Sequence, residues 1–133
     1  MYARPDRPRR RHGDDGAAAT ELVIAMPAML LLILVSVHVG LWFHARSLAD
    51  AAAHEGARGA RLLGATDADG EARANQMLND LGPGVVTDST VIVTRTATTV
   101  TVVVTGHAPA VIPGLVLDVR SSATSPIEAF RPT

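Results

Sequence analysis

The stretch LVIAMPAMLLLILVSVHVGLWF, residues 22–43, decides the fold because its 22 residues include no formally charged side chain. A helix of that length spans roughly 33 Å at about 1.5 Å per residue, enough to cross the hydrocarbon core of a bilayer. We therefore predict a transmembrane helix over residues 17–44. A cleaved secretory signal peptide is the alternative, although its apolar core is normally shorter, about 7–15 residues.

The charges around this run predict its orientation. Five arginines lie within the first 16 residues, whereas only Arg46 follows the run closely. The positive-inside rule then predicts a single-pass plasma-membrane protein with a cytoplasmic N-terminus and an extracytoplasmic C-terminus. Trp42 and Phe43 fall at the outer end, where aromatic rings favour the headgroup level. Because the arginines adjoin a membrane span and have one aromatic neighbour, we interpret them as a topology signal and leader, with no nucleic-acid partner.

The residue content argues against several kinds of functional site. The 133 residues include no cysteine, which excludes disulfides, thiolate zinc sites and cysteine nucleophiles. The histidines are scattered, with no pair at a helical metal-binding spacing: His12, His38, His44, His54 and His107. We find no nucleophile motif and no phosphate-binding loop. The chain is therefore not expected to be an enzyme, and no cofactor or metal is predicted.

One histidine lies inside the apolar run. His38 has no second titratable group on its helical face. Two interpretations stay open, a proton relay and a neutral imidazole bonded to a neighbouring helix or to water.

Beyond the run, residues 45–63 are predicted to continue the helix. Alanine recurs at every fourth position from Ala45 to Ala57, and Gly56 with Ala60 makes another small pair. Such spacing allows this helix to approach closely either a partner helix or the chain's own sheet, and both alternatives stay open.

A second short helix is predicted after a cap at Thr66 or Asp67. It ends at Gly82 and has one apolar face. That face contains Ala74, Met77, Leu78 and Leu81.

The C-terminal part has strand character. Alternating β-branched residues predict strands at 90–96, 99–105 and 115–125, with a two-residue hairpin turn at Ala97 and Thr98. The predicted fold class is α+β: a long transmembrane helix continuing into a soluble helix, a second short helix, and a small three-stranded, mainly antiparallel sheet. We divide the chain into a basic cytoplasmic leader (1–16), the transmembrane helix (17–44), a helical stalk with the second helix (45–82) and an extracytoplasmic β-rich head (83–133).

A single carboxylate, Glu21, stands directly before the apolar run. An unpaired carboxylate at a membrane is costly, so it is a functional candidate by default; hydration from the cytoplasmic side is the alternative. Gly16 ends the polar leader and Ala17 follows it. This arrangement resembles a type IV prepilin-like N-terminus, in which a membrane aspartic peptidase cuts after the glycine and leaves glutamate as the fifth residue.

The stretch GAAATELVIAMP, residues 16–27, narrows the resemblance to the TadE-like family, with Pro27 six residues beyond Glu21. Leu22 stands where the family usually has phenylalanine. A second patch, Glu55-Gly56-Ala57-Arg58, is similar to that family's E-G-A-R motif.

The resemblance implies a minor pseudopilin of a tight-adherence (Flp-type) pilus or related secretion apparatus. Its implied partners are a prepilin peptidase, other pseudopilins or pilus-assembly membrane proteins, and the lipid bilayer. Glu21 would then pair with a free amine at Ala17 or with that of a neighbouring subunit. The alternative is an uncleaved signal-anchor protein whose head binds an envelope partner.

Overall fold

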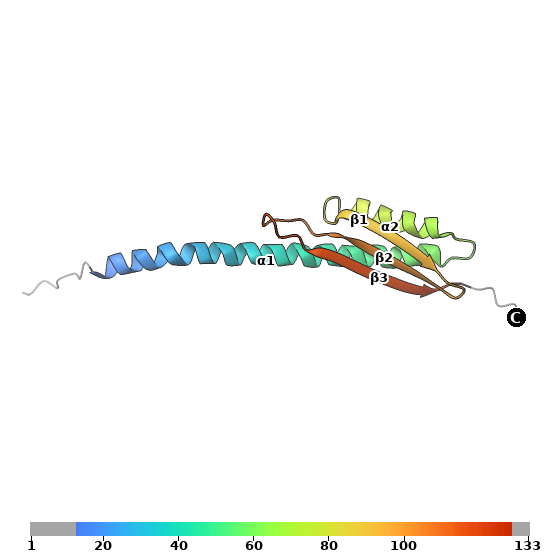
Figure 1. The fold of residues 1–133 in the computed structure, drawn as a ribbon, viewed down its shortest axis with the longest axis horizontal. Coiled ribbons are helices and arrows are strands. Elements are labelled where there is room, and N and C mark those ends of the chain that lie inside the picture. Colours follow the sequence, from blue (N-terminus) through green and yellow to red (C-terminus); the bar gives the residue numbers. More distant parts are fainter. Residues whose placement is uncertain (1–12, 129–133) are drawn as a thin grey trace, which may run out of the picture. The chain divides into compact units, whose positions relative to one another are not determined.

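The computed structural model describes residues 13–128, which form two helices and three strands (Figure 1). They run in the order α1 (Gly13–Ala60), α2 (Asp67–Leu81), β1 (Thr87–Arg95), β2 (Thr99–His107) and β3 (Asp118–Pro126). The chain divides into two compact units, residues 1–35 and 36–133, and α1 contributes to both. The predicted α+β fold, with its long apolar helix and three-stranded antiparallel sheet, is confirmed.

In the first unit, the described residues belong to α1 and have an apolar, exposed surface. The consecutive residues Leu30 to Ile33 are each more than half exposed, so no side of the helix is buried within the chain there. Pro27 lies inside the helix without ending it. Among the described residues, α1 is the one helix long and apolar enough to cross a membrane. A helix that is apolar all round is the expected form of a lipid-facing segment.

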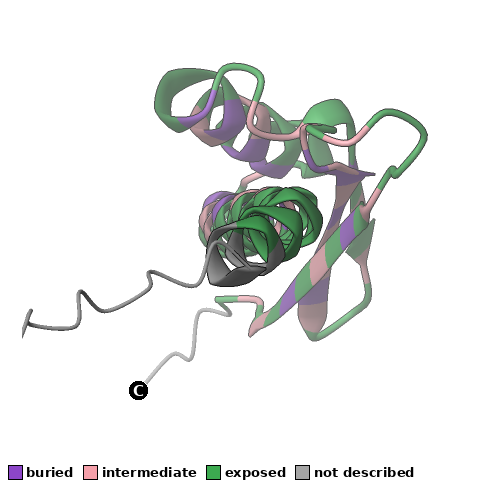
Figure 2. Ribbon diagram, turned by 90° about the vertical axis from the view of Figure 1, so that its left-hand side faces the viewer, coloured by how far each residue is buried: buried purple, intermediate pink, exposed green. Residues whose placement is uncertain are grey.

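The second unit is built on the sheet, whose strands lie in the order β1-β2-β3 with antiparallel pairing throughout. Viewed along α1, both helices lie on one face of the sheet (Figure 2). Strand β2 is central, and its alternate residues Val100, Val102 and Val104 are fully buried on that face. The period-two alternation of strands therefore directs these valines toward the helices.

Alanines of α1 complete this core. Buried alanines repeat along one helical face and join the valines of the sheet in one cluster: Ala45, Ala49, Ala52, Ala53 and Ala57. Of the two alternatives for this row, packing against the chain's own sheet is correct. The core between helix and sheet consists mostly of alanine and valine, with Leu48 and Leu78 also buried in it. The helix backbone must therefore come close to the sheet to exclude water.

Two polar contacts join α1 to strand β3. The indole N–H of Trp42 donates to the backbone carbonyl of Asp118 at 3.0 Å, and the Ser121 hydroxyl donates to an Asp50 carboxylate oxygen at 2.7 Å. The Trp42 ring also packs against the core cluster. Trp42 is therefore part of the packing of this unit, whereas Phe43 beside it is 61% exposed.

A capping box begins α2, as the sequence predicts at Thr66. The Thr66 hydroxyl accepts from the Asp69 amide, while the Asp69 carboxylate accepts from the Thr66 amide at 2.7 Å and from its hydroxyl at 2.8 Å. These hydrogen bonds, first from the Thr66 backbone and then from its side chain, lower the pKa of Asp69 below its ordinary value of 3.8. The box satisfies amides that would otherwise lack partners in the first turn.

Several predicted boundaries are wrong. β1 begins at Thr87 rather than Thr90, because a bulge around Asp88 (φ 50°) interrupts the alternation. It also ends at Arg95, one residue early. β2 extends from Thr99 to His107.

β3 begins at Asp118 rather than Leu115 and ends at Pro126. The residues before it form a tight turn around Pro113 and Gly114, which removes them from the sheet. The two-residue hairpin turn at Ala97 and Thr98 is confirmed, since Arg95 pairs with Val100 and the Thr96 amide donates to the Thr99 carbonyl.

Two helix details also differ from prediction. α1 ends at Ala60 rather than continuing to residue 63. In α2, Ala74 and Leu78 are buried as predicted, but Leu81 is 63% exposed because it occupies the last position of the helix. The predicted end at Gly82 is confirmed, and the Gly82 amide donates to the Leu78 carbonyl at 3.3 Å.

Replacing Thr66 with alanine should lower the free energy of unfolding by about 1 kcal/mol at pH 7, the usual cost of losing such a cap. Urea unfolding of the detergent-solubilised chain, followed by the fluorescence of its single tryptophan, measures the change. Thr66→Ser keeps the hydroxyl and should behave as wild type. Because the pKa of Asp69 is lowered in the folded state, its contribution is present above pH 3.8 and is lost as the pH falls toward the lowered value. Equal stability of both variants at pH 7 would contradict a role for the box.

Candidate functional site

The structure places both sequence patches on α1. Gly16 and Glu21 are exposed, and the Thr20 hydroxyl donates to the Gly16 carbonyl at 2.8 Å. Ala17 is helical, while its side chain and the leader residues 1–12 lie outside the described part of the structure. Ala17 and Glu21 are four residues apart, so they share one helical face one turn apart. Among the described residues, no cation lies within ion-pair distance of Glu21.

The surface around Glu21 is strongly apolar. Leu22, Val23 and Ile24 follow it with exposed fractions of 58%, 71% and 71%. This exposure continues along the helix through Met26, Met29 and the leucines beyond. A carboxylate at the start of such a surface is hydrated in water, but it needs a counter-charge when it enters a membrane or another helix interface.

The second patch, Glu55 to Arg58, lies where α1, α2 and β2 meet. A Cβ on Gly56 would stand 2.9 Å from the Gly70 carbonyl oxygen, 3.0 Å from Ala74 Cβ and 3.1 Å from Val102 Cγ1. A Cβ on Gly70 would in turn stand 2.7 Å from Ala60 Cβ. The small pair Gly56 and Ala60 thus faces a small pair of α2, Gly70 and Ala74. Glycine is needed here because any side chain would separate the two helices.

The other three residues of the patch divide between core and surface. Ala57 is fully buried in the core cluster. Glu55 pairs with Arg73 of α2 at 3.2 Å and with Arg58 at 3.7 Å, and its side chain is 31% exposed. Arg73 and Arg58 are half or more exposed, so these ion pairs contribute only a few tenths of a kcal/mol to about 1 kcal/mol. The patch therefore orients α2 on α1 mainly through close packing.

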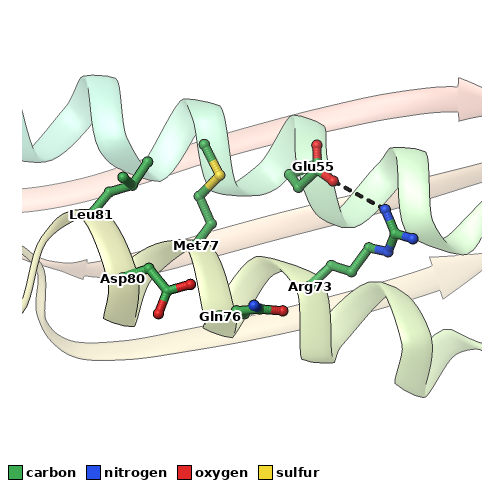
Figure 3. A pocket seen from close by; sticks show the side chains of 6 residues that line it. All are labelled: Glu55, Arg73, Gln76, Met77, Asp80 and Leu81. Atoms are coloured by element: carbon green, nitrogen blue, oxygen red, sulfur yellow. Dashed lines mark hydrogen bonds and ion pairs between the residues drawn. The ribbon is translucent and has the colours of Figure 1, made fainter.

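A shallow groove of about 440 Å³ opens beside this junction (Figure 3). Figure 3 shows the Glu55–Arg73 ion pair at one end of the groove and Leu81 at the other, with Met77 between them. Its lining comes from both helices: Glu55, Arg73, Gln76, Met77, Asp80 and Leu81. The groove has no nucleophile beside a base and no cluster of metal ligands. Across the described residues, no group of three or more His, Cys, Asp or Glu side chains could hold a metal ion.

Sequence reasoning missed Arg95. Its guanidinium donates to the carbonyls of Ala60 and Ala65 at 2.6 and 3.0 Å, and to the Asp67 carboxylate at 3.0 Å. Arg95 therefore ties the end of β1 to the end of α1 and the start of α2, satisfying a carbonyl left open where α1 stops. Nothing in the local pattern pairs Arg95 with partners 28 to 35 residues away.

His38 makes a hydrogen bond within the chain that neither interpretation named. It is only 2% exposed, and its Nδ1 accepts from the backbone amide of Val111 at 3.4 Å. The partner of Nδ1 is thus a loop of the same chain. Its Nε2 atom is buried without a partner among the described residues.

Comparison with known proteins finds a family match that covers both sequence patches of α1. Residues 16–58 match the model of the TadE family, described as TadE-like protein. The match includes Gly16, Glu21 and the Glu55–Arg58 patch, and it ends two residues before α1 does. No curated protein and no solved structure matches the chain. The predicted resemblance to TadE-like proteins is confirmed for this segment.

The close contact at Gly56 predicts that alanine substitution has opposite effects on stability at two glycines of α1. Gly56→Ala should lower the free energy of unfolding by about 1–3 kcal/mol, because the added methyl overpacks the contact with α2 and Val102. Gly40→Ala is the matched control: a Cβ there meets nothing within 4 Å, so stability should stay equal or rise by up to about 1 kcal/mol through helix propensity. Urea unfolding followed by Trp42 fluorescence compares them, and similar behaviour of the two variants would contradict the assigned contact.

Proposed function

We propose that this chain is a minor pseudopilin, cut after Gly16, that acts in assembly of a tight-adherence (Flp-type) pilus or a related secretion apparatus. The observation that carries the proposal is the TadE-like match over residues 16–58. It includes a carboxylate that stands exposed at the start of an apolar helix. In this role the chain is a structural subunit rather than an enzyme, and it needs no cofactor.

In this proposal α1 holds the chain in the plasma membrane. Its apolar, exposed surface suits lipid contact, and the arginines of residues 1–16 favour a cytoplasmic N-terminus. The sheet and α2 then lie outside the cytoplasm, where they can meet other pseudopilins or membrane proteins of the assembly machinery.

Processing would create a positively charged partner for the Glu21 carboxylate. A cut after Gly16 leaves a free amine on Ala17, one helical turn from Glu21 on the same face. The carboxylate could pair with this amine or with the amine of a neighbouring subunit, and either pairing offsets the cost of removing it from water. Pairing between subunits would also set how far one helix slides along the next.

The cut site suits a peptidase because it lies close to the start of α1, which begins at Gly13. The first four amides of a helix have no intrahelical acceptor, so this turn unwinds at little cost. Gly16 also leaves its surroundings open, since a Cβ there meets nothing within 4 Å.

Glu21→Ala should leave membrane insertion intact but lower surface piliation or secretion about tenfold or more. An ion pair of only about 1.4 kcal/mol between subunits already changes an association constant tenfold. Glu71→Ala removes an exposed carboxylate from α2 and is the matched control. Piliation is measured by counting pili or by quantifying pilin in the sheared fraction. Wild-type piliation with Glu21→Ala would contradict an assembly role for the carboxylate.

Gly16→Leu should block removal of the leader, because a branched side chain would stand directly before the bond to be cut. The variant should accumulate in membranes as a larger species on immunoblots. Gly40→Leu, at another glycine of α1 with open space, should be processed normally. A Gly16→Leu chain of mature size would show that the cut lies elsewhere, and unprocessed wild type would instead favour an uncleaved signal anchor whose head binds an envelope partner.

A further inference from the structure

The loop between β2 and β3, residues 108–117, has the sequence APAVIPGLVL and includes no charged residue. Three of its apolar side chains, Val111, Leu115 and Val116, are 38%, 42% and 57% exposed, whereas Ala108 is buried and Leu117 packs against the core cluster. Serine, threonine and arginine predominate among the exposed positions of the outer sheet face. An apolar group concentrated on one loop is therefore a candidate interaction surface.

The loop has a fixed shape. Ile112, Pro113, Gly114 and Leu115 form a tight turn in which the Leu115 amide donates to the Ile112 carbonyl at 3.1 Å. Proline at the second position and glycine at the third, with φ of 83°, define a type II turn. At the base, the Ala108 amide donates to the Leu117 carbonyl at 2.9 Å. The apolar side chains are thus held in place before any partner arrives, which lowers the entropic cost of binding.

The loop lies beside the apolar part of α1. The Val111 amide donates to Nδ1 of His38, which is 2% exposed. His38 lies within the 22-residue uncharged run, whose neighbouring side chains Val37 and Val39 are 48% and 42% exposed. The loop therefore adds its exposed apolar groups to an apolar surface that already suits lipid.

Ionisable side chains stand at the edge of both apolar segments, the loop and the uncharged run of α1. His107 and Asp118 flank the loop and lie 2.9 Å apart, with the Asp118 side chain 87% exposed. On α1 the uncharged run ends at residue 43, and the Arg46 guanidinium lies 5.6 Å from the Trp42 ring centre. The hydrogen bond from Trp42 to the Asp118 carbonyl joins these two boundaries directly.

We propose that residues 110–116 insert into the headgroup and upper acyl region of the leaflet through which α1 leaves the membrane. This inference rests on the proposed membrane anchoring by α1. An irregular turn is better tolerated at the interface than in the hydrocarbon core, because the core offers no water to its backbone groups. The loop then acts as a second contact with lipid that fixes the tilt and rotation of the β-sheet unit on the membrane.

The absence of cysteine allows a clean test with single labels. Val116→Cys, Ala97→Cys and Leu31→Cys are each labelled with a polarity-sensitive NBD fluorophore in the full-length chain. All three positions are exposed, and Ala97 lies in the β1–β2 turn, outside the proposed insertion. Each labelled chain is reconstituted into phosphatidylethanolamine and phosphatidylglycerol vesicles, with or without nitroxide lipids. Shallow nitroxides probe the loop and deep ones probe the helix.

The proposal predicts a blue-shifted emission at Val116 with a loss of fluorescence in shallow-nitroxide vesicles, and no loss at Ala97. Leu31 should be quenched by deep nitroxides. Quenching at Leu31 without quenching at Val116 would overturn loop insertion while leaving the anchor in place. A blue shift at Val116 without quenching would also overturn it, since protein rather than lipid would then cover the loop. No quenching at Leu31 would refute the membrane anchor and the loop inference together.

Discussion

The unit formed by residues 36–133 depends on a close contact at Gly56, where α1 meets α2 and β2 without room for one more carbon atom. Alanine and valine make up most of the buried core, with Leu48 and Leu78 beside them, so close approach of the backbones is needed to exclude water. Alanines on α1 extend the same principle along the sheet. Arg95 then fixes the ends of three elements with hydrogen bonds that need this arrangement.

The two patches within the TadE-like segment therefore have different physical roles in this chain. Gly56 and Ala57 pack against other elements of the same chain, and Glu55 forms an ion pair with Arg73 of α2. Glu21, by contrast, is exposed and makes no ion pair among the described residues. The proposed contact with a second subunit therefore involves Glu21 at the start of α1, whereas the Glu55–Arg58 patch packs within the unit of residues 36–133.

The sequence predicted what depends on local periodicity. The apolar run, a helix cap at Thr66 or Asp67 and the two-residue hairpin turn follow from spacing alone, and the structure contains the run, the cap at Thr66 and the turn. The errors arose where one local signal competes with another. Leu115 to Leu117 resemble a strand in composition, but Pro113 and Gly114 turn the chain first.

Features that join distant segments could not be predicted. The contact of Gly56 with Gly70, the bond from Val111 to His38, and the three partners of Arg95 each require knowing which elements lie side by side. For the alanine row of α1, periodicity left two partners open, and only the structure distinguishes the chain's own sheet from another helix.

The state of the N-terminus in the native membrane tests the central claim most directly, because the proposed pairing of Glu21 needs the amine that a cut after Gly16 creates. Intact-mass spectrometry of the chain extracted from native membranes locates that terminus. The account predicts a chain that begins at Ala17 and lacks residues 1–16. A chain that begins at Met1 would contradict it and would leave Glu21 without the proposed amine.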